Sequence, residues 1–155
     1  MKELKKEHLK IKRGLPQFNN EKAIILVLGK EEGFIFRAKN RNINVVGKFE
    51  EKALKYSDRK KDFDIKAGSK TLRVGSPSYS IKSDQRHKFV KKSVINLIAI
   101  TKREKPDLIY LLLPAYLSKM VRDRLPAEIR RKLVFTVMGN YIRKHPFVIL
   151  EKIIN

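Results

Sequence analysis

Unbroken apolar runs separated by short polar turns dominate the first part of this chain. Residues 23–28 read Ala-Ile-Ile-Leu-Val-Leu, a run without alternation that is typical of a strand buried on both faces. Further apolar stretches at residues 34–36 and 43–49 follow it, across turns at residues 29–33 and 40–42. Because turns this short join neighbouring strands of opposite direction, the pattern predicts three strands in an antiparallel meander.

The second half of the chain alternates helical and strand-like patterns. Apolar residues recur at helical spacing between residues 86 and 104, and Pro114 and Pro146 each stand where a helix can begin. The elements predicted here are a helix over 86–104, a strand over 107–113, helices over 114–124 and 127–131, a strand over 133–137 and a helix over 146–154. The resulting order, β-β-β-α-β-α-β-α, predicts an α/β fold with a mixed five-stranded sheet flanked by helices, which is the order of ribonuclease-H-like folds.

The two ends of the domain are marked by composition. Residues 1–20 carry six basic and two acidic side chains and include the turn formers Gly14 and Pro16. We interpret them as a basic N-terminal arm and residues 21–155 as the domain, which is expected to fold without the arm. Residues 51–86 lose all periodicity, and a stretch this long inside a small domain is usually functional or disordered.

The charge balance directs the functional hypothesis. The 155 residues contain 37 Lys+Arg against 16 Asp+Glu, a formal net charge of +21. Such an excess stores self-repulsion, so a polyanionic partner is the first hypothesis. The absence of cysteine excludes disulfides and thiolate metal sites. The longest apolar runs are shorter than the ~20 residues that a membrane-spanning helix needs, so we expect a cytoplasmic protein with no membrane partner.

The residues offer little support for catalysis. Ribonuclease-H-like nucleases hold metal ions with clustered carboxylates, one of them on the first strand, yet residues 23–28 contain no acid. His8, His87 and His145 are too far apart for a local metal motif. We therefore predict no catalytic residue, no metal site and no cofactor. An enzymatic activity stays open but is not the favoured interpretation.

The segment 66–92 is the most basic part of the chain. Eight Lys/Arg residues face a single acid, Asp84. If the helix begins near residue 86, the cations in its first turns oppose the helix dipole, and a bound anion would relieve that cost. The alternative is a mobile, solvated loop without a ligand. Together with a second basic group at 122–131, the segment predicts a nucleic-acid interface in which Tyr79 stacks on an unpaired base. The predicted contact residues are Lys66, Lys70, Arg73, Tyr79, Lys82, Arg86, His87, Lys88, Lys91, Lys92, Arg122, Arg124, Arg130 and Arg131.

Three stretches resemble known families. The opening, Ala-Ile-Ile-Leu-Val-Leu-Gly-Lys-Glu-Glu-Gly-Phe-Ile-Phe-Arg-Ala over 23–38, resembles the bacterial family called "protein required for attachment to host cells". So does the stretch over 107–134, with its Leu-Pro-Ala-Tyr-Leu and Leu-Pro-Ala-Glu-Ile-Arg steps. That family resembles the middle domain of archaeal and eukaryotic class-1 peptide release factors. In those factors a Gly-Gly-Gln loop precedes a basic helix, and His-Lys-Phe-Val-Lys-Lys over 87–92 resembles its start.

The resemblance implies an RNA-binding protein that acts on ribosomal RNA or tRNA as a translation or stress factor. Because no Gly-Gly-Gln occurs, release activity is not carried over. Gln85 follows Ser83 and Asp84, which are expected to cap the helix, so it should sit in a capped turn rather than at a flexible tip. Two alternatives stay open: a peptidyl-tRNA or other ester hydrolase, and a host-attachment or interaction protein that binds an acidic partner. The oligomeric state is not predicted.

Overall fold

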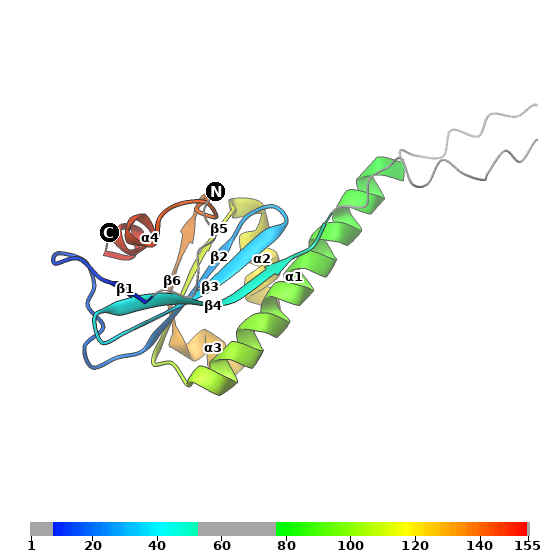
Figure 1. Ribbon diagram of the computed structural model, residues 1–155. Coiled ribbons are helices and arrows are strands. Elements are labelled where there is room, and N and C mark those ends of the chain that lie inside the picture. The colour runs from blue at the N-terminus through cyan, green and yellow to red at the C-terminus, as the bar shows by residue number, and fades with distance from the viewer. Residues whose placement is uncertain (1–7, 53–76, 155) are drawn as a thin grey trace, which may run out of the picture.

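A computed structural model describes residues 8–52 and 77–154, with side chains in the second range from residue 82 onward. A six-stranded mixed sheet lies between a layer of three helices and a second layer made of one helix and the N-terminal arm (Figure 1). The predicted α/β class with a mixed sheet is therefore confirmed. Within the described ranges, no helix is both long enough and apolar enough to cross a bilayer.

The sheet contains one strand more than predicted. Its order is β1-β4-β3-β2-β5-β6, and the extra strand is β1 (Leu9–Lys10), which pairs antiparallel with one edge of β4. A two-residue strand is too short to show alternation, so the five-stranded prediction was wrong at this point. The other strands are β2 (Ala23–Leu28), β3 (Glu32–Lys39), β4 (Asn42–Glu50), β5 (Leu108–Leu113) and β6 (Leu133–Met138).

The centre of the sheet follows directly from the apolar runs. Every residue of β2 is buried, because its side chains alternate between the buried clusters on the two faces of the sheet. β3 pairs with β2 antiparallel on one side and β5 pairs with it parallel on the other. The turn between β3 and β4 has positive φ angles at Asn40 (50°) and Arg41 (62°). Two consecutive positive φ angles mark the turn class whose twist matches that of a hairpin, so the predicted meander is confirmed.

The first helical layer consists of α1 (Pro77–Glu104), α2 (Ala115–Arg124) and α3 (Ala127–Lys132). Side chains of all three pack on the face of the sheet that carries Ile24, Leu26 and Leu111. The prediction placed the start of α1 at residue 86, nine positions too late. Apolar spacing marks only the packed part of a helix, and the N-terminal end of α1 extends beyond the sheet (Figure 1).

The opposite face of the sheet is covered by α4 (Pro146–Ile154) and by the arm. Ile149 and Leu150 of α4 pack with Ile11 and Phe18 of the arm in one buried cluster. The ring of Phe18 meets Tyr110 edge-on, with centroids 6.4 Å apart. The described part of the arm, from residue 8 onward, therefore belongs to the packed structure.

Candidate nucleic-acid interface

A side-chain contact joins the two basic segments that the sequence places far apart. Nη2 of Arg124 in α2 donates to Nδ1 of His87 in α1 over 3.0 Å, across 37 positions of sequence. A guanidinium carries only donors, so Nδ1 must accept and the ring proton must sit on Nε2. The pair thus presents further N–H donors, and no acceptor, at the junction of the two helices.

A second contact between α1 and α2 adds an aromatic ring to this junction. The guanidinium of Arg86 lies over the ring of Tyr116, 5.1 Å from its centroid. Tyr116 is 48% exposed, unusually open for a large apolar side chain. The sequence argument missed this residue, although Leu117 and Val121 define the buried face of α2 and leave Tyr116 off it. An exposed ring beside a guanidinium is a surface on which an unpaired base can stack.

Two exposed lysines extend the same surface along α1. Lys91 stands four residues after His87, hence one turn further on the same face, and Lys88 stands three residues before Lys91, on the solvent side of that face and away from Tyr116. We call the whole set the α1–α2 seam; it consists of Arg86, His87, Lys88, Lys91, Tyr116 and Arg124. Acidic residues lie beside it: Asp84 is exposed three residues before His87, and Glu31 and Glu51 line the cavity that Arg86 and Tyr116 share.

Other predicted contact residues have different surroundings. Lys92 is held by the end of β4: its Nζ lies 3.2 Å from a carboxylate oxygen of Glu51 and donates to the backbone carbonyl of Glu50 over 2.6 Å. This ion pair offsets the charge that Lys92 would bring to a phosphate. Lys82 is exposed and lines a cavity of about 310 Å³ beside Arg86. The predicted contact residues Lys66, Lys70 and Arg73 lie outside the described residues. Tyr79 lies in α1, but its side chain is not described.

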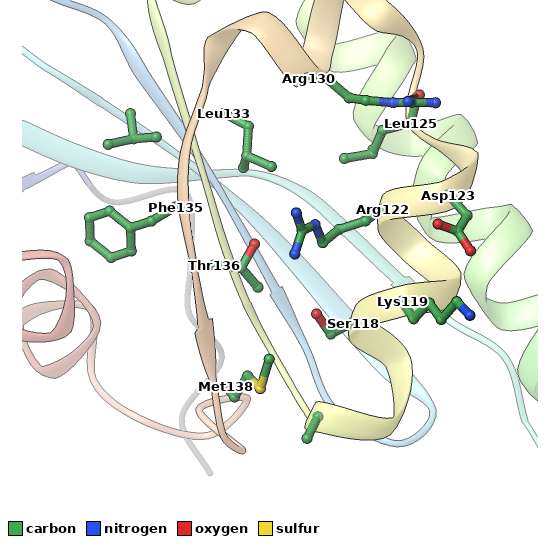
Figure 2. A pocket seen from close by; sticks show the side chains of 12 residues that line it. Ser118, Lys119, Arg122, Asp123, Leu125, Arg130, Leu133, Phe135, Thr136 and Met138 are labelled. Carbon is green, nitrogen blue, oxygen red and sulfur yellow. Dashed lines mark hydrogen bonds between the residues drawn. The ribbon is translucent and has the colours of Figure 1, made fainter.

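The second basic group divides over both sides of α2. Arg122 and Arg124 are two positions apart, so they point to opposite sides of the helix. Arg124 reaches α1, whereas Arg122 lines an open groove of about 850 Å³ between α2 and β6 (Figure 2). Arg130 lines the same groove, and its Nε donates to the backbone carbonyl of Leu125 over 2.7 Å. Arg131 is exposed on α3.

The position of the seam within α1 corrects two expectations. Because α1 begins at Pro77, residues 86–91 lie from its third turn onward rather than at its N-terminus. The unfavourable helix dipole that we expected there acts only on the first turn, so that argument for a bound anion is wrong. Ser83 and Asp84 lie inside the helix and do not cap it, and Gln85 is likewise a helical residue that lines the cavity beside Lys82.

The perturbed acid of the helical layer lies at the far end of α1. Burial raises the pKa of Glu104, but hydrogen bonds and charges of Arg37 and Arg103 outweigh this, so its pKa lies below the ordinary value. Arg37 Nη1 is 3.1 Å from the carboxylate. At a rise of ~1.5 Å per residue, Glu104 is roughly 25 Å from His87 along the helix. Among the described residues no three His, Cys, Asp or Glu side chains gather as a metal-binding group.

Comparison with known proteins gives information on the fold alone. No protein-family model matches this sequence, and no curated protein matches it. The structure is similar to a solved structure described as "Archaeal protein", with a TM-score of 0.50, 9% identity and 86% of this chain covered. It is also similar to the archaeal translation termination factor aRF1, with a TM-score of 0.47, 10% identity and 77% of this chain covered. The matched regions are 34% and 30% of those two chains.

Proposed function

We propose that this protein binds RNA through the α1–α2 seam, with ribosomal RNA or tRNA as its partner. The observation that carries the proposal is the contact between His87 and Arg124, because it merges two basic segments into one surface. The net charge of +21 supplies long-range attraction to any polyanion. The seam adds to this a local arrangement of donors that a uniformly basic surface lacks.

The chemistry of the seam suits RNA better than a generic anion. Arg124, Lys88 and Lys91 offer charged donors to phosphate oxygens. Tyr116, with Arg86 against its ring, offers a stacking surface, and sequence-selective RNA recognition uses stacking of unpaired bases on aromatic and guanidinium planes. A site with donors on one side and a ring on the other fits a backbone bend with an unstacked base.

We also propose a role in translation or in a stress response, in the cytoplasm. This part of the proposal rests on the resemblance of residues 87–92 to the basic helix of release factors. The fold is proposed to be ribonuclease-H-like. No contact in the described ranges favours the hydrolase or the attachment alternative. A glutamine acts in ester hydrolysis by positioning a water beside the ester, and Gln85 stands inside a helix rather than in a loop.

The proposal is tested by comparing two variants of equal charge. One replaces four seam cations with glutamine, at Arg86, Lys88, Lys91 and Arg124. The control replaces four exposed lysines on other elements, Lys10, Lys39, Lys144 and Lys152. Fluorescence anisotropy measures the affinity of each for a tRNA transcript and for a ribosomal RNA hairpin over a series of salt concentrations.

Each lost phosphate contact lowers the log–log salt slope by roughly 0.7 to 0.9, so the seam variant, which loses the three contacts of Lys88, Lys91 and Arg124, should lose roughly two to three units of slope. The control should lose much less, although both proteins carry the same net charge. Equal losses in the two variants would show that attraction is diffuse and would refute the seam as the binding site. Circular dichroism of both variants checks that the fold is unchanged.

A further inference from the structure

β6 is an edge strand whose outer side has no partner within the described ranges. It pairs parallel with β5 on its inner side and ends the sheet. Val134 is 47% exposed and Met138 is 59% exposed, which places two large apolar side chains in solvent on one short strand. Edge strands with exposed apolar residues readily pair with another chain unless something protects them.

The chain that leaves β6 turns inward and does not cover this edge. Arg143 reaches Glu32 at the start of β3, with Nη2 and Oε1 3.4 Å apart. Ile142 packs against Gly29, at the end of β2. The segment after β6 therefore crosses the end of the sheet toward its centre, away from the outer side of β6.

A hydrogen bond made by the residue after β6 shows which backbone groups of β6 point toward β5 and which point outward. Gly139 donates its N–H to the carbonyl of Leu113 in β5 over 3.0 Å. Because successive residues of a parallel strand turn their backbone groups to alternate sides, Val137 also faces β5. Thr136 and Met138 then direct their N–H and C=O groups outward. A register shift at Val134 limits regular pairing to residues 135–138.

A groove runs along the same strand and carries both positive charge and apolar surface. Three cations line it, Lys119, Arg122 and Arg130, against one acid, Asp123. Figure 2 shows the guanidinium of Arg122 directed toward Thr136. On the β6 side the groove is lined by Leu133, Val134, Phe135, Thr136 and Met138.

We propose that an extended acidic segment of a partner protein adds as a strand to the outer side of β6. Its backbone would pair with Thr136 and Met138, as in other recognition by strand addition. Every second side chain of that segment would point toward α2, where carboxylates meet Arg122 and its neighbours. The strand spacing places these carboxylates ~7 Å apart.

Two other occupants fit the surface less well. A second copy of this chain would bring two sets of groove cations together at a net charge of +21 each. A single-stranded RNA satisfies the cations, but its backbone has no row of alternating donors and acceptors for the outward groups of Thr136 and Met138. Charge complementarity, together with a strand edge that no described residue pairs with, therefore favours an acidic peptide.

The test uses a fluorescent peptide in which glutamate and valine alternate over about six residues, the length of a typical strand. Thr136→Pro removes an outward N–H, and proline is tolerated on an edge strand where no ladder bond is lost. Thr136→Val is the matched control, because it keeps the N–H and the side-chain shape. Arg122→Gln tests the charge.

We expect Thr136→Pro and Arg122→Gln each to weaken peptide binding at least tenfold, and Thr136→Val to leave it within twofold. An affinity unchanged by Thr136→Pro would overturn the proposal. Amide hydrogen exchange of the unmodified protein gives an independent readout should Thr136→Pro unfold: the peptide should slow exchange at Thr136 and Met138, and unchanged rates would contradict strand addition.

Single-stranded RNA that competes with the peptide and protects these amides equally would assign the groove to RNA instead. tRNA binding at the seam should not respond to Thr136→Pro, which separates this test from that of the proposed function.

Discussion

Truncating the buried side chains of the N-terminal arm should destabilise the whole domain. Ile11 is 4% exposed and Phe18 is 8% exposed, and both pack in the cluster that α4 covers. Core truncations cost about 2–5 kcal/mol for Ile→Ala and about 3–5 kcal/mol for Phe→Ala. Both side chains keep a little exposure, unlike the fully buried residues of the same cluster such as Ile25, so the lower ends apply.

We therefore expect Ile11→Ala to lower the free energy of unfolding by about 2 kcal/mol and Phe18→Ala by about 3 kcal/mol. Urea unfolding followed by circular dichroism measures both values. Asn20→Ala is the control: this residue is exposed, so the change should stay within about 0.5 kcal/mol. Losses below that limit for both arm variants would refute the packing of the arm.

The same numbers bear on the domain boundary at residue 20, which stays a prediction. Removal of both side chains should cost about 5 kcal/mol, against a typical total of about 5–15 kcal/mol. We expect residues 21–155 to unfold cooperatively at a clearly lower urea midpoint, since β2, β3 and β5 keep their pairing. A non-cooperative transition would show that the arm is an obligatory part of the domain.

Three further predictions concern the core, an ion pair and the seam. Gly33→Ala should lower the free energy of unfolding by about 1–3 kcal/mol in urea titration, because the new Cβ overlaps the ring of Phe49. The pKa of Glu104 is depressed in the fold, so its contribution to stability is present above the unfolded pKa and is lost as pH falls through the folded value. Glu104→Gln, which also loses the contact with Arg37, should therefore flatten the acid limb of the stability–pH curve. Tyr116→Ala should weaken RNA binding by about 1–3 kcal/mol if the ring stacks on a base, whereas Tyr116→Phe should be nearly neutral in anisotropy titrations.

The sequence predicted the elements whose signal is carried by packing. The unbroken run over residues 23–28 marked the central strand, because a strand covered on both faces has no polar positions. The start of α1 was missed because its first turns extend past the sheet, where no apolar periodicity arises. β1 was missed because two residues are too few to show a period.

The candidate interface was predicted only as separate basic segments. Composition shows that residues 86–92 and 122–131 are basic, but their meeting depends on how α1 packs against α2. The contact between His87 and Arg124 is a consequence of tertiary structure and has no local signal. Tertiary structure also removes a predicted contact: Lys92 is paired with Glu51 at the end of β4, and the sequence near Lys92 does not show this ion pair.

The most direct test of the account is to map where RNA lies on the protein. A tRNA transcript containing 4-thiouridine is bound at moderate salt and irradiated, and cross-linked peptides are identified by mass spectrometry. The account predicts cross-links in residues 82–92 and 115–124, with Tyr116 among the modified side chains, and loss of these cross-links in the variant with four seam cations replaced. Cross-links concentrated in α4 or in the arm, on the opposite face of the sheet, would contradict it.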